Sequence, residues 1–203
     1  MEDKPPHFEL PETKTGGCSF AFIGSTRSGK TTFLKYILDK YFSKHLSVLM
    51  SPSIHAPIYK DVDDAIACPA YVPAVIKEAY DINKKTDNHY PFLFILDDVV
   101  TAKFDKELLK LLTIYRNSHI SAIISVQSPI LLNSASRGNI NFVLLGKLNS
   151  DESIEKVVRM YLMSFLQGKI DDKIRQYKEL CEGHHFFVVN NLDGSVFRTK
   201  IDV

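Results

Sequence analysis

The chain has 203 residues, of which 45% are hydrophobic and 24% are charged. These are ordinary values for a globular protein, and they exclude a collagen-like rod as well as a chain that is disordered over most of its length. The formal net charge is only +1 at pH 7, so binding of nucleic acid would need a local basic patch or many copies around one strand.

Cysteine usage and hydropathy exclude further classes of protein. The three cysteines, Cys18, Cys68 and Cys181, show no CxxC spacing, which argues against a disulfide scaffold and against a zinc site. No apolar run reaches the roughly 18–20 residues of a membrane span, and the N-terminus lacks the apolar region of a signal peptide. We therefore expect a cytosolic protein with an irregular arm at residues 1–17 and a single domain at residues 18–203.

Short apolar runs alternate with amphipathic segments along the chain. The runs predict strands, and the segments with apolar residues at spacings of three and four predict helices. In chain order we expect a strand at residues 18–23, a helix at 31–42, a strand at 47–50, a helix at 73–84, a strand at 92–96, a helix at 104–115, strands at 121–126 and 142–145, a helix that starts at Asn149, and hairpin strands at 186–189 and 195–198. Residues 54–70 follow no clear pattern. This order predicts an α/β fold: a mainly parallel, doubly wound sheet with helices on both faces and a C-terminal antiparallel hairpin.

Residues 24–31 read Gly-Ser-Thr-Arg-Ser-Gly-Lys-Thr and match in full the pattern G-x-x-x-x-G-K-[ST], the phosphate loop of P-loop NTPases. The loop follows a predicted strand and opens a predicted helix, as this motif requires. Glycines let backbone N–H groups face the phosphates, and the helix start adds partial positive charge. The residues expected to contact a nucleotide are Gly24, Ser25, Thr26, Arg27, Ser28, Gly29, Lys30, Thr31 and Thr32.

Individual residues of this loop have different expected tasks. Lys30 reaches the β- and γ-phosphates as a point charge, the Thr31 hydroxyl binds Mg²⁺, and Thr32 assists the phosphate contacts. Arg27 either lies over the nucleotide or faces solvent. The alternative for the whole segment is a glycine turn that carries a lysine by chance, which the strand–loop–helix setting disfavours.

A second motif follows further along the chain, where five consecutive apolar residues, 92–96, end in Asp97 and Asp98. This is the pattern of a Walker B element, and parallel strands would bring Asp97 to the same sheet edge as the phosphate loop. We expect Asp97 to hold Mg²⁺ through water and Asp98 to orient the attacking water. The alternative is a pair of acids that caps the next helix.

Three more polar residues are candidates for catalysis. Gln127 leaves the predicted strand 121–126 at the catalytic edge, where it either senses the γ-phosphate and holds the water or starts a loop with a local backbone bond. Arg116 and Arg137 are candidates for stabilising transition-state charge on the nucleotide of a neighbouring subunit. For each arginine the alternative is a surface ion pair.

The order of these motifs resembles the FtsK–HerA superfamily of P-loop motor ATPases, and within it the genome-packaging ATPases of poxviruses, other large DNA viruses and virophages. The resemblance is carried by residues 24–32, 92–98, 116–119, 126–129 and 137–141. It implies that Gln127 is the sensor and Arg116 the finger that acts on a neighbouring subunit, with Arg137 in reserve. The chain departs from many members at Asp98, where they carry the longer Glu.

The resemblance also implies a function. It points to an ATP- and Mg²⁺-dependent motor that moves double-stranded DNA into a virus particle as a homo-oligomeric ring, meets capsid proteins, and works in the host cytoplasm, the viral factory or the virion. The alternatives are a small-molecule kinase and a slowly hydrolysing, nucleotide-gated assembly switch. Such kinases close an arginine-bearing lid over the phosphates, and no segment after residue 140 resembles one unless Lys169, Lys173, Arg175 and Lys178 are forced into that role. Candidate DNA contacts are residues 169–178, diluted by Asp171 and Asp172, and the pair Lys84 and Lys85; the alternative for each is a solvated surface.

Overall fold

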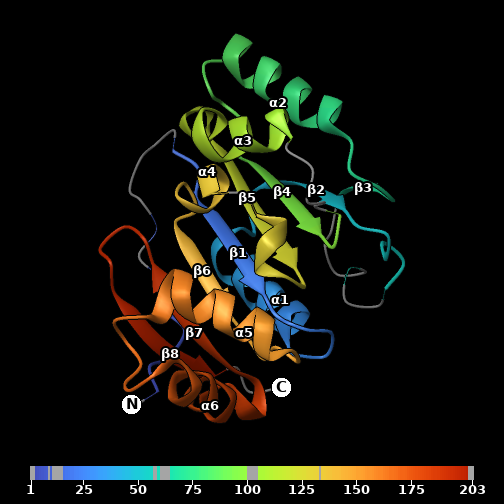
Figure 1. Ribbon diagram of the computed structural model, residues 1–203. Helices are drawn as coiled ribbons and strands as arrows, with labels where there is room; N and C mark the ends of the chain where they lie inside the picture. Colours follow the sequence, from blue (N-terminus) through green and yellow to red (C-terminus); the bar gives the residue numbers. More distant parts are fainter. Residues whose placement is uncertain are drawn as a thin grey trace.

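Eight strands form one sheet, in the order β3-β2-β4-β5-β1-β6-β7-β8 (Figure 1). The computed structural model describes residues 3–8, 10, 16–56, 59, 65–99, 105–132 and 134–200, and all of these strands lie within those ranges. The strands are β1 (Ser19–Ile23), β2 (Leu46–Met50), β3 (Ile66–Cys68), β4 (Phe92–Asp97), β5 (Ile120–Val126), β6 (Phe142–Leu145), β7 (His185–Asn190) and β8 (Val196–Lys200). The six strands from β3 to β6 in this order are parallel, whereas β7 runs antiparallel to β6 and β8 to β7. The predicted parallel sheet with a terminal hairpin is confirmed.

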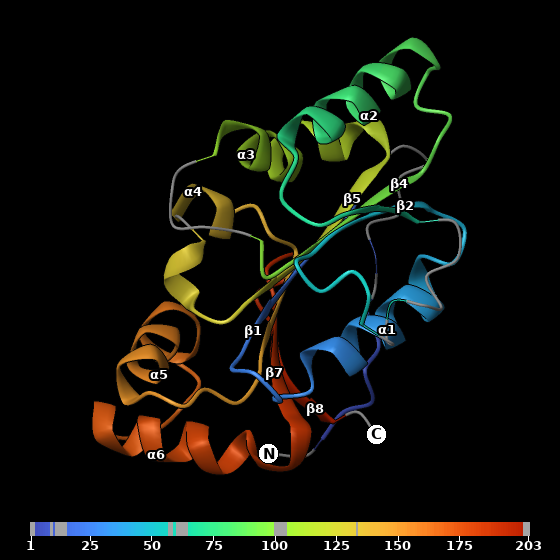
Figure 2. The same ribbon diagram turned by 90° about the vertical axis from the view of Figure 1, so that its right-hand side faces the viewer.

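Helices cover both faces of this sheet (Figure 2). One face carries α1 (Lys30–Tyr41), and the other carries α2 (Pro73–Lys85), α3 (Lys106–Thr113), α4 (Ser134–Arg137), α5 (Asp151–Val157) and α6 (Ile170–Leu180). Short 3-10 or π turns are η2 (Tyr115–Ser118), η3 (Pro129–Leu131), η4 (Val158–Leu162) and η5 (Glu182–His184). The doubly wound arrangement is thereby confirmed. Among the helices of the described residues, none has both the length and the apolar character that crossing a bilayer requires.

Two elements, β3 and α6, are not among the predicted strands and helices, because their apolar pattern is weak. β3 is an edge strand of three residues inside the segment without a clear pattern, and it is too short for periodicity to be recognised. α6 is mostly polar and is anchored by Tyr177, whose buried hydroxyl donates a hydrogen bond of 2.6 Å to the carbonyl of Gly146. Tertiary contact, and not amphipathic pattern alone, therefore defines this helix.

Two predicted helices begin at slightly different places than expected. The helix expected from Asn149 begins slightly later, because Ser150 is the cap and its hydroxyl accepts a 3.1 Å bond from the N–H of Ser153. The helix expected over 104–115 is α3, which Asp105 caps by accepting a 2.7 Å bond from the N–H of Leu108. Its first expected apolar residue, Phe104, lies outside the described residues. A side-chain oxygen at the cap satisfies a backbone donor that the first helical turn leaves free.

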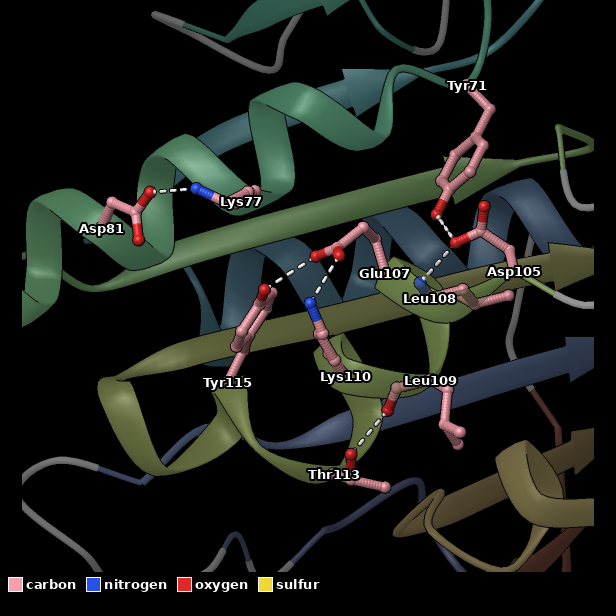
Figure 3. A network of polar contacts seen from close by, with 10 residues as sticks. All are labelled: Tyr71, Lys77, Asp81, Asp105, Glu107, Leu108, Leu109, Lys110, Thr113 and Tyr115. Atoms are coloured by element: carbon pink, nitrogen blue, oxygen red, sulfur yellow. Dashed lines mark hydrogen bonds and ion pairs between the residues drawn. The ribbon is translucent and has the colours of Figure 1, made fainter.

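A polar network around Glu107 holds η2 against α3 (Figure 3). The Tyr115 hydroxyl donates a 2.7 Å hydrogen bond to Glu107, and the Tyr115 ring stacks on Tyr80 of α2 with ring centroids 4.1 Å apart. Burial and the neighbouring Glu107 both raise the pKa of Tyr115, which keeps the phenol a donor. The turn that carries Arg116 is consequently fixed to the body of the domain.

The N-terminal segment packs onto the α1 face instead of projecting from it. The N–H of Lys4 donates a 2.9 Å bond to the carbonyl of Arg198 in β8, so this segment runs beside the sheet edge. The Phe8 side chain is 2% exposed and lies edge-on to Phe20 and Phe142, at centroid distances of 5.3 and 5.2 Å. Of the arm expected at residues 1–17, residues 1, 2, 9 and 11–15 lie outside the described residues.

Replacing Phe8 by Ala should lower the free energy of unfolding by about 3–5 kcal/mol, the usual cost of removing a buried aromatic ring from a core. Urea denaturation followed by circular dichroism measures this change. The Phe8→Leu variant keeps most of the apolar contact and should lose clearly less. An unchanged unfolding midpoint for Phe8→Ala would show that the segment contributes no packing to the domain.

Candidate active site

Parallel strands bring the predicted motifs to one edge of the sheet. Ile23, the last residue of β1, lies opposite Val126, the last residue of β5. Asp97, the last residue of β4, lies opposite Ser125, which also belongs to β5. The phosphate loop, the acidic pair and Gln127 therefore leave three adjacent strands at the same end. The expectation that Asp97 shares this edge with the phosphate loop agrees with the strand order.

The phosphate loop encloses the ammonium group of its own lysine. Lys30 is the first residue of α1 and is only 8% exposed. Its Nζ donates hydrogen bonds of 2.7 Å to the carbonyl of Gly24 and 3.0 Å to that of Ser25. Gly29 has a φ of 91°, in the left-handed region, where a residue with a Cβ is strained. The conformation is that of a loop folded around a central cation, with its glycine where the backbone needs one.

Other residues of the loop differ in their exposure. Arg27 and Thr26 are exposed, whereas Thr31 and Thr32 are half-buried in the first turn of α1. The buried Ser28 lies against Gly24, where an added Cβ would come within 2.7 Å of the Ser28 hydroxyl oxygen. Gly24 is thus needed for a close approach inside the loop.

The charge of Lys30 is balanced between burial and nearby acids. Burial lowers the pKa of Lys30, and the negative charges of Asp98 and Asp97 act in the opposite direction without cancelling it. An ammonium group held in this way gains from an additional anion beside it. The loop is therefore suited electrostatically to a phosphate group.

The two acids have different partners. Asp97 Oδ2 accepts a 2.5 Å hydrogen bond from the Tyr59 hydroxyl and a longer one, 3.5 Å, from the Ser51 hydroxyl. Asp98 has a φ of 53°, and its N–H donates to the carbonyl of Ser125 at 3.0 Å. Its Oδ2 accepts a 3.0 Å bond from Nε2 of Gln127. The turn at Asp98 thus directs its carboxylate toward Gln127, while the Asp97 carboxylate faces Ser51 and Tyr59 in the segment that follows β2.

Tyr59 is a site residue that the sequence analysis misses. It lies in the segment without a clear pattern after β2 and is 6% exposed. Its N–H donates a 3.0 Å bond to the carbonyl of Ala56. Burial, followed by the charge of Asp97, raises the pKa of Tyr59 well above its usual range, so its hydroxyl stays a donor. A single tyrosine outside any motif gives no sequence signal of this role.

The two arginines are not brought to this edge with the other candidates. Arg116 belongs to η2, which precedes β5, and the seven residues of β5 separate it from Gln127 by about 23 Å at 3.3 Å per residue. Arg137 ends α4, and its carbonyl accepts a 3.4 Å bond from the N–H of Ile140 just before β6 begins, so it lies toward the amino end of that strand. Its guanidinium donates a hydrogen bond to the carbonyl of Leu132. The site of a single chain consequently unites Lys30, Asp98 and Gln127 but neither arginine.

The donor set fits a magnesium ion. The Thr31 hydroxyl and the Asp97 carboxylate supply oxygen atoms, which Mg²⁺ prefers, and neither is fully buried. In P-loop proteins the remaining ligands come from phosphate oxygens and water. The three cysteines are free, and Cys18 and Cys181 are buried.

Comparisons with known proteins agree with this fold. Residues 7–198 match the family model described as Poxvirus A32 protein. No curated protein sequence matches the chain. The genome packaging NTPase B204 of Sulfolobus turreted icosahedral virus 2, in complex with sulfate, has a TM-score of 0.69 at 11% identity, and the match covers 92% of this chain and 98% of that one.

Two further solved structures are similar. B204 of Sulfolobus turreted icosahedral virus, described as a DNA-packaging ATPase, has a TM-score of 0.62 at 12% identity, covering 92% of this chain and 98% of that one. The pCW3 conjugation coupling protein TcpA, with ATPγS, has a TM-score of 0.64 at 14% identity, covering 92% of this chain and 61% of that one. At such identities the likeness shows the fold, and it confirms the predicted P-loop NTPase class.

The role of Tyr59 can be tested with Tyr59→Phe, which removes the donor to Asp97 and keeps the ring. We expect binding of Mn²⁺, a spectroscopic probe of the Mg²⁺ site, to weaken several-fold in the presence of a non-hydrolysable ATP analogue, because Asp97 is no longer held in place. Electron paramagnetic resonance measures the free Mn²⁺.

The matched control is Tyr71→Phe, which breaks the same kind of bond, from a tyrosine hydroxyl to Asp105 at 2.7 Å, outside the site. Both variants should lose about 1 kcal/mol of stability, but only Tyr59→Phe should lose affinity for Mn²⁺. Equal Mn²⁺ binding in the two variants would contradict a positioning role for Tyr59.

Proposed function

The chain belongs to the family of poxvirus A32 proteins, and on that premise we propose that it is an ATPase that drives double-stranded DNA into a virus particle. The observation that carries the proposal is the closed phosphate loop around Lys30 beside the bonded pair Asp98 and Gln127. The likeness to B204, described as a genome packaging NTPase and solved with AMPPCP and ATP-gammaS, supports it, as does the likeness to a conjugation coupling protein.

Each residue has a separate task in hydrolysis. Lys30 exchanges its two carbonyl partners for oxygens of the β- and γ-phosphates, where its charge stabilises the transition state. Asp98 orients the attacking water, and Gln127 fixes that carboxylate and senses the γ-phosphate. Thr31 and Asp97 would hold Mg²⁺, which neutralises phosphate charge when it is bound.

Lys30→Ala should reduce ATP hydrolysis by at least about 100-fold, because it removes the point charge on the phosphates. Release of phosphate, measured with and without duplex DNA, tests this. Lys44→Ala is the matched control, since Lys44 is an exposed lysine just beyond α1. If the protein is a motor, duplex DNA should stimulate ATP hydrolysis by the unmodified protein. Undiminished hydrolysis by Lys30→Ala, or transfer of phosphate to a small acceptor without any effect of DNA, would contradict the proposal.

The position of Arg116 supports a role on the neighbouring subunit. The length of β5 separates it from the phosphate loop of its own chain, so it reaches a nucleotide only across an interface. Tyr115, anchored on Glu107 and Tyr80, presents it from a fixed turn. Arg137 is the reserve candidate, although its guanidinium is already bonded to the carbonyl of Leu132. The ATPase we propose is therefore a homo-oligomer, arranged as a ring around the DNA.

A mixing experiment tests the interface. Lys30→Ala and Arg116→Ala should each be inactive alone, and a mixture of the two should recover part of the DNA-stimulated hydrolysis. Recovery is expected because some interfaces then join an intact Lys30 to an intact Arg116. Co-assembly is verified by the mass of the mixture in solution with a non-hydrolysable ATP analogue. If the subunits co-assemble but show no activity, then either Arg137 is the arginine that acts on the neighbouring subunit or hydrolysis does not depend on a ring.

The two candidate DNA contacts differ in how their charges are used. Residues 169–178 include most of α6, and three of their four basic side chains are engaged within the chain: Lys173 with the carbonyl of Met163, Arg175 with Asp172, and Lys178 with Asp151. This pairing disfavours both a DNA contact and the basic lid of a kinase. Lys84 and Lys85 are exposed at the end of α2 and are the better candidates. A ring multiplies such a pair, and contacts to phosphates make binding independent of sequence and sensitive to salt.

A role in genome packaging also predicts the protein's partners and its location in the cell. A protein that inserts a genome meets the capsid, so capsid proteins are the proposed partners besides DNA. The host cytoplasm or the viral factory is the proposed place of action, with the virion as an alternative final location of the assembled motor.

A further inference from the structure

The turn that carries Arg116 is held through its main chain as well as through Tyr115. The carbonyl of Arg116 accepts a 2.5 Å hydrogen bond from the N–H of Gly17, in the segment that leads into β1. Gly17 lies so close to the start of β5 that an added Cβ would come within 1.8 Å of the carbonyl oxygen of Ile120. The backbone at Arg116 is therefore fixed to the segment that precedes β1.

A buried asparagine of α2 holds the far end of the same turn. Asn83 is 0% exposed, and its Nδ2 donates hydrogen bonds of 2.7 Å to the carbonyl of Tyr90 and to that of Ser118. Its Oδ1 accepts a 3.1 Å bond from the N–H of Tyr90. Because a carbonyl can only accept and an N–H can only donate, these partners fix the orientation of the amide. Asn83 thus joins α2, the loop before β4 and the last residue of η2.

The bond to Ser118 goes beyond what the loop before β4 requires. If Asn83 served that loop alone, its two bonds to the loop would be sufficient. The third bond ties to α2 the residue that lies two positions after Arg116. Three residues before Asn83 on the same helix, the ring of Tyr80 stacks on Tyr115 with centroids 4.1 Å apart. α2 therefore contacts η2 on both sides of Arg116.

A fixed turn matters for an arginine that acts across an interface. A small rotation of a short turn moves the end of a long side chain, and a displacement of about 1 Å can reduce a rate about 100-fold. We propose that Asn83 is a positioning residue, which holds η2 so that Arg116 reaches the nucleotide of the neighbouring subunit. This rests on the proposed function, in particular on the action of Arg116 across the interface. It predicts that Asn83 matters in the subunit that supplies Arg116 and not in the subunit that binds the nucleotide.

The test places one substitution in either member of a complementing pair. Arg116→Ala keeps an intact phosphate loop and Lys30→Ala keeps an intact arginine, so their reference mixture contains active interfaces of one kind only. Asn83→Ala is added either to the Lys30→Ala chain, which supplies Arg116, or to the Arg116→Ala chain, which supplies the loop. In the first mixture we expect the recovered DNA-stimulated hydrolysis to fall about tenfold. In the second mixture we expect it to stay unchanged.

Controls separate positioning from a loss of stability. Asn191→Ala removes a bond of the same kind, from an amide to the carbonyl of Ile140 at 2.7 Å, and should leave both mixtures unchanged. Asn83→Ala alone should bind a non-hydrolysable ATP analogue as tightly as the unmodified protein, because its own phosphate loop is intact. Thermal unfolding and the mass of each mixture show whether the chains are folded and co-assembled.

A second variant serves if Asn83→Ala does not fold. Asn83→Asp keeps the size of the side chain and an acceptor for the N–H of Tyr90, but it lacks the amide that donates to Ser118. The same dependence on the chain that carries the substitution is expected for it.

The outcomes distinguish this proposal from the proposed function. If the unmodified protein does not hydrolyse ATP, or the reference mixture co-assembles without recovery, the proposed function or its interface fails, and the role of Asn83 fails with it. If the reference mixture recovers, an equal effect of the Asn83 substitution in both chains, a loss only in the chain that supplies the loop, or no effect at all would overturn the role of Asn83 alone. A loss confined to the chain that supplies Arg116 supports it.

Discussion

The site depends on the parallel pairing of β1 with β5 on one side and with β6 on the other. Because the carboxyl ends of parallel strands meet at one edge, the phosphate loop has Gln127 on one flank and Lys147 on the other. The same neighbours fix its backbone, since Gly24 donates to the carbonyl of Val126 and Ser25 to that of Lys147. An antiparallel strand at either place would take its following loop to the opposite edge. The pairing therefore places Gln127 and the segment after β6 on opposite flanks of the phosphate loop.

The residues that could be predicted from the sequence are those whose chemistry is local. The phosphate loop and the acidic pair each follow an apolar strand within a few residues, so a short window contains both the element and its function. Tyr59 could not be found in this way, because it is 38 residues from Asp97 and lies outside any periodic segment. The hydrogen bonds of Ser25 with Lys147 and Asn149 could not be found either, because they follow from the parallel pairing of β1 with β6. The spacing of apolar residues reveals individual helices and strands, whereas contacts between segments on neighbouring strands depend on the order of the strands in the sheet.

Charged groups of the site are held by neutral partners. Lys30 is bonded to two carbonyls, Asp97 to two hydroxyls and Asp98 to an amide. Among the ion pairs of the described residues, none joins Lys30 to either acid. A direct pair would have to be broken when a phosphate arrives, and breaking one with a buried partner is costly. When phosphate oxygens replace the two carbonyls, the ammonium group of Lys30 remains hydrogen-bonded. The lysine is therefore already in position before the ligand binds.

The separation of Arg116 from the phosphate loop constrains the proposed assembly. The loop lies at the carboxyl edge of the parallel strands, and η2 lies at their amino edge. A contact that brings Arg116 of one chain to Lys30 of another joins unlike surfaces, which is a heterologous interface. Repetition of such an interface produces either an open helix or a closed ring, and a ring completes every site. Each interface of such a ring would contain one phosphate loop and one arginine. Hydrolysis at any site would therefore depend on how tightly the neighbouring subunit is bound. The network of Tyr115, Glu107 and Tyr80 that fixes the Arg116 turn would thereby couple the fold of one subunit to the catalytic rate of the next.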